Sequence, residues 1–265
     1  MRVTEGFSEV CEQAVRAAGK ILLEKWGRVA VREKGRADLV TEADLASQET
    51  VRRTIADAFP HHALVGEEDP PDTQHPSVAA EYRWIVDPLD GTTNYVHGVP
   101  HFSVSLALER SGILLVGAIY DPVADECFTA GRGQGACLNG EPIHSSSAGR
   151  LSEALVAVGF PAVVRPDSPD LRAFFEAVTA CQAIRRTGSA ALNLAYVAAG
   201  RFDACWSFST KAWDAAAGAL IVCEAGGVVS DPRGTPFVLD RGHFLACATP
   251  TLHQALLALM ARADP

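Results

Sequence analysis

Two aspartates on either side of a proline form the most chemically informative feature of the sequence. Residues 84–95 read WIVDPLDGTTNY, in which three apolar residues predict a buried strand that ends on Asp87, with Asp90 three positions later. Pro88 fixes the backbone between the two acids, and Gly91 permits a tight turn. Carboxylates on such a turn can share hard cations, and N–H groups at the start of a following helical turn can hold a phosphate. The structural alternative is an Asx-type turn that caps a short helix, and the D-x-x-D spacing alone favours it.

Three further acidic positions each have a structural explanation of their own. Glu67 follows a short apolar strand, twenty residues before Asp87. Asp214 opens an alanine-rich helix, where an acid is favoured by the helix dipole. Asp44 forms with Thr41 a Thr-x-x-Asp pattern, which is typical of a helix capping box. Taken singly, none of these acids requires a catalytic role.

Taken together, the acids and their surroundings resemble the inositol monophosphatase family of Mg²⁺-dependent, lithium-sensitive phosphatases. The resemblance covers nearly the whole chain and is carried by five ordered segments, which are 38–44 (DLVTEAD), 64–68 (LVGEE), 84–95 (WIVDPLDGTTNY), 188–193 (GSAALN) and 213–227 (WDAAAG to EAGG). It implies a layered αβαβα sandwich, with an α+β first half and an α/β second half. We expect a metal-bearing subdomain at 1–145 and a second subdomain at 146–265 that supplies Asp214 and substrate contacts.

The resemblance also implies a role for each matching residue. The groups implied to hold two or three Mg²⁺ ions are the carboxylates of Glu67, Asp87, Asp90 and Asp214 and the backbone carbonyl of Leu89. Thr92, supported by Asp44, would orient or deprotonate the attacking water, and Glu67 would assist a third, weaker ion. The backbone N–H groups of Gly91 and Thr92 would cradle the phosphate. The implied substrate contacts are Gly91, Thr92, Gly188, Ser189, Ala190 and Ser207.

Physical chemistry independently favours a metal at such a cluster. Phosphate-monoester hydrolysis is among the slowest uncatalysed reactions, and enzymes accelerate it by up to about 10²¹-fold. Carboxylates about 4 Å apart repel one another by about 4 kcal/mol per pair at an effective dielectric near 20. Two cations remove this repulsion and stabilise an in-line displacement, and Mg²⁺ suits a set of oxygen ligands.

Three positions bear on the substrate. Thr93 follows the Asp-Gly-Thr triplet, as in inositol monophosphatases, whereas histidinol-phosphate and 3′-phosphoadenosine phosphatases often have lysine there. Ser207 stands where inositol-type members usually have a glutamate that accepts hydrogen bonds from sugar hydroxyls, and Lys211 nearby can favour a second anionic group. We expect inositol 1-phosphate as the substrate, with histidinol phosphate, 3′-phosphoadenosine 5′-phosphate and fructose 1,6-bisphosphate as alternatives. A Mg²⁺-binding regulatory protein is the non-enzymatic alternative.

Composition narrows the class of protein. The 265 residues are 48% hydrophobic and 21% charged, which is an ordinary globular composition, and the formal net charge is −9. The sequence has no basic run longer than a pair, no apolar stretch of about eighteen residues and no apolar signal region, so we expect neither a nucleic-acid partner nor a membrane. Seven scattered cysteines without a CxxC pair predict a reduced, cytoplasmic protein with these thiols in its core. The resemblance implies a homodimer.

Hydrophobic periodicity predicts the elements that position these residues. The predicted helices are 5–26, 41–59, 169–181, 189–199, 213–225 and 251–262. The predicted strands lie near 64–65, 84–86, 102–108, 113–120, 126–130, 155–158, 202–206, 227–230 and 244–248. The polar segment 31–40 is expected to be mobile, and Gly200 and Gly226 stand at expected helix C-termini.

Other motifs carry weaker signals. The glycine-rich run 131–135 (GRGQG) suggests an alternative hypothesis, a nucleotide-dependent oxidoreductase. A dinucleotide-binding loop opens a helix, however, and no helical pattern follows this run. His97 and His101 are four residues apart, yet Gly98 and a proline between them break a helix, which argues against zinc. The pair 185–186 (RR) is expected on a solvated or interface surface, with the alternative that one arginine reaches a neighbouring active site.

Overall fold

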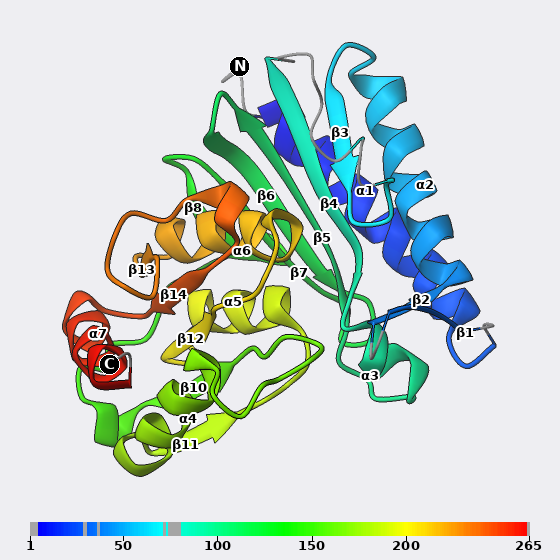
Figure 1. Ribbon diagram of the computed structural model, residues 1–265. Helices are drawn as coiled ribbons and strands as arrows, with labels where there is room; N and C mark the ends of the chain where they lie inside the picture. Colours follow the sequence, from blue (N-terminus) through cyan, green and yellow to red (C-terminus); the bar gives the residue numbers. More distant parts are fainter. Residues whose placement is uncertain (1–4, 29–30, 36–37, 71–72, 74–80, 264–265) are drawn as a thin grey trace.

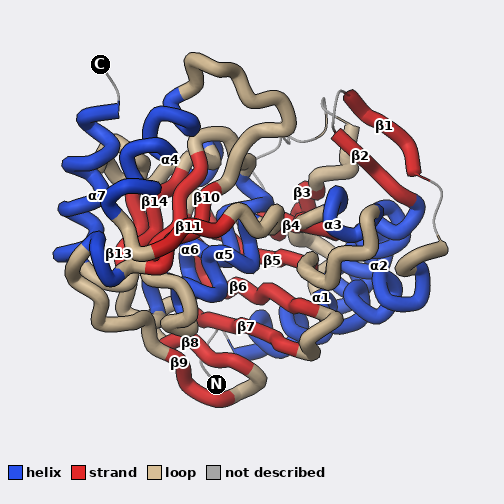
Figure 2. The backbone as a smooth tube through the Cα atoms, turned by 90° about the horizontal axis from the view of Figure 1, so that it is seen from below, coloured by secondary structure: helices blue, strands red, loops and turns tan. Residues whose placement is uncertain are grey.

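Two main β-sheets alternate with three layers of helices, which confirms the expected αβαβα sandwich (Figures 1 and 2). The computed structural model describes residues 5–28, 31–35, 38–70, 73 and 81–263. The helices are α1 (Glu5–Lys25), α2 (Glu42–Ala58), α3 (Thr92–Val96), α4 (Pro169–Ala180), α5 (Ala190–Ala198), α6 (Ala212–Glu224) and α7 (Pro250–Ala263). In the part of the chain that the structure describes, no helix combines the length and apolar character needed to cross a bilayer.

The larger sheet has seven strands in their sequence order, with β3 and β4 parallel and every other neighbouring pair antiparallel. The strands are β3 (Ala63–Gly66), β4 (Tyr82–Asp90), β5 (Ser103–Arg110), β6 (Ile113–Asp121), β7 (Glu126–Gly131), β8 (Gly135–Leu138) and β9 (Glu141–Ile143). Helices α1 and α2 cover one face, and α6 packs on the other (Figure 1). The predicted antiparallel meander is therefore confirmed.

The smaller sheet has five strands in the order β11-β10-β12-β14-β13. The strands are β10 (Leu155–Val158), β11 (Ala183–Arg185), β12 (Ala204–Ser207), β13 (Val228–Ser230) and β14 (Phe244–Cys247). Strand β10 runs parallel to β11 and β12, whereas β14 is antiparallel to β12 and β13. Helices α4 and α7 form the outer layer beside this sheet, opposite α5 and α6 (Figure 2).

Helices α5 and α6 form the central layer, and small residues let them approach their neighbours closely. A Cβ on Gly117 of β6 would lie 2.9 Å from the Cα of Ala217 in α6. A Cβ on Gly218 of α6 would lie 2.4 Å from the Cβ of Leu194 in α5. One buried hydrophobic cluster includes residues of both sheets and of both central helices. Helix α6 is thus fixed between the two sheets, with its first turn at their common edge.

The glycines expected at helix C-termini are confirmed. Gly200 follows α5 with a φ of 69°, and Gly226 follows α6 with a φ of 92°. Both backbones are left-handed, a conformation that glycine adopts without the Cβ clash that other residues incur.

Four expectations about local structure were wrong. The segment 31–40 contains two paired antiparallel strands, β1 (Val31–Gly35) and β2 (Asp38–Thr41), while residues 36–37 lie outside the described part. Strand β4 continues beyond Asp87 to Asp90, and the short strands β8, β9 and β11 were not predicted. Cys223 lies on an exposed surface of α6 instead of in the core.

Candidate active site

A cleft of about 540 Å³ opens where the two sheets meet around the first turns of α3, α5 and α6. Its described lining comes from these helix starts and from the segments that follow β3, β10, β11 and β12. Glu67, Asp90 and Asp214 lie in this lining, at positions far apart in the sequence. The cleft therefore brings together three of the acidic positions on which the sequence analysis depends.

Asp87, Asp90 and Asp214 form the centre of the site. Each offers a carboxylate oxygen, and these three oxygens lie within 4.8 Å of one another. A bulge in β4 brings the first two together, because Asp87 pairs with Ser105 whereas Asp90 pairs with Ser103. The three-residue advance from Asp87 to Asp90 in β4 thus matches a two-residue advance in β5, and the extra residue in β4 turns both aspartates to the same face of the sheet.

The first turn of α5 holds Asp90. Its Oδ1 accepts a hydrogen bond from the Ala190 N–H at 3.2 Å, and its Oδ2 accepts one from the Ala191 N–H at 2.8 Å. The hydroxyl of Ser189 also donates to Oδ2 and accepts from the Leu192 N–H, so it caps the helix. This carboxylate joins the larger sheet to the central helix layer.

The other two aspartates also have local backbone contacts. Asp87 Oδ1 accepts a hydrogen bond from the Leu89 N–H at 3.0 Å, which is the turn contact expected for the D-x-x-D pattern. Asp214 Oδ2 accepts from the Lys211 N–H at 2.7 Å at the start of α6. Asp87 therefore forms the predicted Asx-type turn, although no side chain caps α3, and Asp214 lies in the first turn of α6 as predicted. The three aspartates also converge, as expected.

Burial raises the pKa of each aspartate in this cluster, and repulsion between carboxylates adds to the shift at Asp87 and Asp90. The pKa of Asp87 lies well above its ordinary value, first because the group is buried and then because Glu67, Asp90 and Asp214 are close. Burial and the charge of Asp214 raise the pKa of Asp90 to about 7, although its hydrogen bonds oppose the shift. Burial also raises the pKa of Asp214. Such a set of oxygen donors lacks positive charge and fits hard divalent cations.

A short loop positions Glu67 beside the cluster. The Gly66 N–H donates to Asp69 Oδ2 at 2.9 Å, while Asp69 Oδ1 accepts from Gln48 at 2.9 Å and from Arg52 at 2.6 Å. A Cβ on Gly66 would lie 2.1 Å from Gln48 Oε1, so any other residue here would displace the Gln48 amide from its present position. Helix α2 therefore fixes the loop that carries Glu67, through side chains that the sequence analysis did not identify.

Asp44 serves two purposes. Its Oδ2 accepts hydrogen bonds from the N–H of Thr41 at 2.8 Å and from the Thr41 hydroxyl at 2.6 Å, which completes the predicted capping box of α2. Its Oδ1 lies 3.3 Å from the hydroxyl of Thr92, which also lies 3.1 Å from the carbonyl oxygen of Leu89. The structure thus brings together the predicted Thr92–Asp44 pair and the predicted carbonyl ligand.

Two glycines line the cleft beside Thr92. Gly91 has a φ of 97°, and a Cβ there would lie 3.1 Å from the carbonyl oxygen of His101 and 3.4 Å from that of Gly188. The Asn94 amide donates to the carbonyls of His101 at 2.7 Å and Thr187 at 2.8 Å, so it joins the two segments. Asn94 was not predicted, because its place in the motif gives no sign of which distant carbonyls it reaches.

The remaining predicted substrate residues occupy two kinds of position. Ala190 and Ser207 line the cleft, as Gly91, Thr92 and Gly188 do. Ser189 is buried, and its hydroxyl is occupied by the contacts with Asp90 and α5 described above.

Three other motifs can now be placed. The backbone N–H groups of the 131–135 turn donate to the carboxylate of Glu224 at distances between 2.8 and 3.1 Å, so the protein itself occupies this loop. His101 packs edge-on against Tyr196, and neither it nor His97 belongs to the acidic cluster found among the described residues. Arg186 lines the cleft of its own chain.

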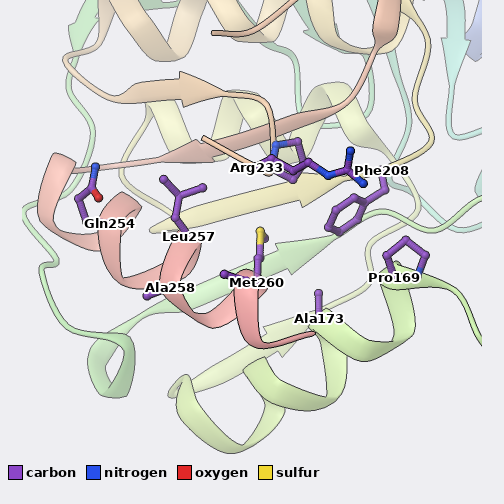
Figure 3. A pocket seen from close by; sticks show the side chains of 10 residues that line it. Pro169, Ala173, Phe208, Arg233, Gln254, Leu257, Ala258 and Met260 are labelled. Atoms are coloured by element: carbon purple, nitrogen blue, oxygen red, sulfur yellow. The ribbon is translucent and has the colours of Figure 1, made fainter. Parts of the chain in front are cut away.

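A second cavity, of about 520 Å³, lies between α4 and α7 (Figure 3). Phe208, Leu257 and Met260 point into it, and none of the described residues that line it is acidic. It therefore lacks the groups that phosphate-ester chemistry requires.

Comparison with known proteins agrees with this geometry. Residues 4–264 match the inositol monophosphatase family. The chain is 42% identical over 261 residues to the Nus factor SuhB of Pseudomonas aeruginosa, covering 96% of this chain and 95% of that one. It is 40% identical over 263 residues to an inositol-1-monophosphatase of Rhizobium meliloti, covering 97% and 96% respectively.

Solved structures show the same similarity. The inositol monophosphatase of Anabaena superposes with a TM-score of 0.86 at 37% identity, covering 98% of this chain and 96% of that one. The extragenic suppressor protein suhB of Bartonella henselae superposes with a TM-score of 0.87 at 37% identity, covering 95% and 97%.

Proposed function

Because this chain belongs to the inositol monophosphatase family, and is therefore a phosphatase of a metal-dependent type, we propose that it hydrolyses small phosphorylated polyols with Mg²⁺. Inositol 1-phosphate is the first candidate substrate, and inositol and phosphate are the products. The observation that carries the proposal is the convergence of three carboxylates beside the Thr92–Asp44 pair in one cleft.

The oxygen donors that converge at the cleft determine which residues would hold the metal. We assign two or three Mg²⁺ ions to the carboxylates of Glu67, Asp87, Asp90 and Asp214 and to the carbonyl of Leu89. When bound, the ions supply a strong nucleophile at neutral pH and stabilise both oxygens of the in-line displacement. The raised pKa values of the three aspartates support the assignment, because bound cations would offset the cost of burying charged carboxylates.

Thr92 and Asp44 position the water that attacks phosphorus. When the Thr92 hydroxyl donates to Asp44 Oδ1, its lone pairs remain available to accept a hydrogen bond from a water in the cleft. That contact would orient the water oxygen toward the phosphorus atom and assist deprotonation of the water. Asp44 can hold this arrangement because its other oxygen is fixed by Thr41.

Backbone groups next to Asp90 would bind the phosphate, and other residues of the cleft would bind the rest of the substrate. The N–H groups of Gly91 and Thr92 open helix α3, where such groups have no intrahelical acceptor and favour phosphate. Gly188 and Ala190 lie beside them, and Ser207 supplies a hydroxyl for a polyol. For Ser189 we propose the role of holding Asp90 in place.

A substrate panel tests the proposal directly. Phosphate release would be measured from inositol 1-phosphate, histidinol phosphate, 3′-phosphoadenosine 5′-phosphate and fructose 1,6-bisphosphate, with Mg²⁺ and after chelation. We expect Mg²⁺-dependent release, the highest kcat/KM for inositol 1-phosphate and inhibition by lithium. Absence of release from every ester would contradict an enzymatic role and favour a Mg²⁺-binding regulatory protein, an alternative kept open by relatives named Nus factor SuhB.

The proposal extends to the oligomeric state and the cellular location. We propose a homodimer, which light scattering on the purified protein checks. We also propose a cytoplasmic location, supported by seven cysteines that are all free.

A further inference from the structure

Arg186 is the one basic residue among the described residues that line the cleft. It follows β11 directly, and Thr187 and Gly188 continue the same wall. The three lining acids, Glu67, Asp90 and Asp214, are those assigned to the metal. The cleft thus has an acidic, metal-binding part and a separate cationic position.

The guanidinium of Arg186 is held in place without being neutralised. Its carbon lies 5.3 Å from the centre of the Phe160 ring, a second residue of the cleft wall. Arg186 forms no ion pair with any residue that the structure describes. Stacking on an aromatic ring orients the guanidinium plane and leaves its N–H groups available at the edge, where they suit carboxylate or phosphate oxygens.

Arg186 also lies close to the end of the cleft that would hold the reacting phosphate. Only Thr187 separates it from Gly188, so the Cα atoms of Arg186 and Gly188 are at most about 7.6 Å apart. The carbonyl oxygen of Gly188 lies 3.4 Å from the position of a Cβ on Gly91, next to Thr92. An anionic group on Arg186 and a phosphate at Gly91 can therefore belong to one small molecule.

Among the described lining residues, none between Val158 and Ala162 or between Ser207 and Thr210 carries a negative charge that could compete for Arg186. Ser207, Ser209 and Thr210 line that part of the cleft, and all three are uncharged. The volume of about 540 Å³ is within the range of cavities that accept a ligand considerably larger than one phosphate.

We propose that Arg186 is a specificity-determining residue that binds a second anionic group, a carboxylate or a phosphate, on the substrate. Small phosphorylated hydroxy acids and bisphosphorylated polyols then gain a contact that an ester with a single phosphate and no other anionic group lacks. This inference deepens the proposed function and rests on it. It adds to the cleft a contact that acts on substrate choice and not on the chemical step.

Matched substrates test the inference. Glycerol 2-phosphate and 2-phosphoglycerate differ only in whether one carbon is a hydroxymethyl group or a carboxylate, and fructose 1-phosphate and fructose 1,6-bisphosphate form the phosphate pair. We expect Arg186→Gln to lower kcat/KM about tenfold for the member with two anionic groups, mainly through KM, and to change the other member less than about twofold. Arg185→Gln is the matched control, because Arg185 is exposed, lies outside the cleft lining and donates to the Ile184 carbonyl.

The outcomes separate this inference from the proposed function. A selective loss in Arg186→Gln that Arg185→Gln does not show supports the inference, and the pair that shows it identifies the anion as carboxylate or phosphate. An equal change for both members of both pairs overturns the inference while leaving the phosphatase intact. If no ester is hydrolysed, the proposed function fails, and calorimetry with the same pairs then tests the inference. Tighter binding of the member with two anionic groups, lost in Arg186→Gln, supports the inference. Equal Kd values for the two members refute it.

Discussion

The Thr92 hydroxyl has one proton and two acceptors within reach, Asp44 Oδ1 at 3.3 Å and the Leu89 carbonyl at 3.1 Å. Its orientation therefore decides whether it can receive a hydrogen bond from the attacking water. We expect Thr92→Ala to lower kcat by about 100-fold or more and to leave KM nearly unchanged, because the contact belongs to the chemical step. Initial rates with Thr92→Ser as the conservative control check this. A change in KM alone would make Thr92 a binding residue.

Asp90 and Asp214 bring charge to the centre of the site, and their amide variants keep the shape while removing the charge. Asp90→Asn and Asp214→Asn should each reduce turnover by at least about 100-fold with saturating Mg²⁺. The fold should persist, because an amide oxygen can still accept the backbone hydrogen bonds of α5 or α6. Circular dichroism and rates would be compared with Asp57→Asn, which alters an exposed aspartate of α2. Full activity in either variant contradicts the two-ion assignment.

At the residue level, the sequence predicted which acids converge and which local contacts they make, but not the tertiary contacts that hold Asp90 and the Glu67 loop. Asp44, Asp87 and Asp214 each make the local cap or turn contact that their spacing indicates. Those same contacts orient the carboxylates, so a structural explanation does not exclude a functional one. Asn94 and Gln48 could not be predicted, because their partners are carbonyls and loops that only the tertiary fold brings near.

At the level of elements, helix α6 carries Asp214 at one end and Glu224 at the other. Glu224 is held by the 131–135 turn, about 15 Å along the helix from Asp214. The alanine-rich pattern predicted this helix well, and the two glycines at its contacts show why small residues were needed. The position of α6 between the sheets therefore controls where Asp214 lies.

Gly218 tests this packing. A Cβ there would come within 2.4 Å of the Leu194 side chain, so Gly218→Ala should destabilise the protein by about 1–3 kcal/mol even though alanine favours helices. Gly6→Ala in α1 is the control, because a Cβ on Gly6 meets nothing within 4 Å. Urea denaturation measures both. A Gly218→Ala variant as stable as the parent would show that α5 and α6 can move apart freely.

The bulge in β4 was beyond sequence analysis, although Pro88 marks its place. Proline removes a ladder donor and is tolerated at bulges, but it does not say that the strand resumes. Strands β1, β2, β8, β9 and β11 were missed for another reason, since segments of three to five residues carry too little periodicity to separate them from loops.

For the whole molecule, the buried acids link folding to pH. The pKa of Asp90 is about 7 in the folded protein against an ordinary 3.8, so the folded state binds more protons than the unfolded state between these values. Stability without metal should therefore fall as the pH rises through this window, and Mg²⁺ should raise Tm more at pH 8 than at pH 5. Melting curves with and without Mg²⁺ check both directions. Asp90→Asn should flatten the pH dependence, and a Tm that rises with pH in the metal-free protein would contradict it.

The central helix layer also has a consequence for how the chain emerges from the ribosome. The larger sheet ends at Ile143, but α6, which covers one of its faces, begins only at Ala212. Roughly 70 residues must still be synthesised, which takes several seconds at typical elongation rates. During that interval the nascent sheet exposes an apolar face with no covering helix, so a chaperone that shields hydrophobic surface should improve the yield of the newly made protein.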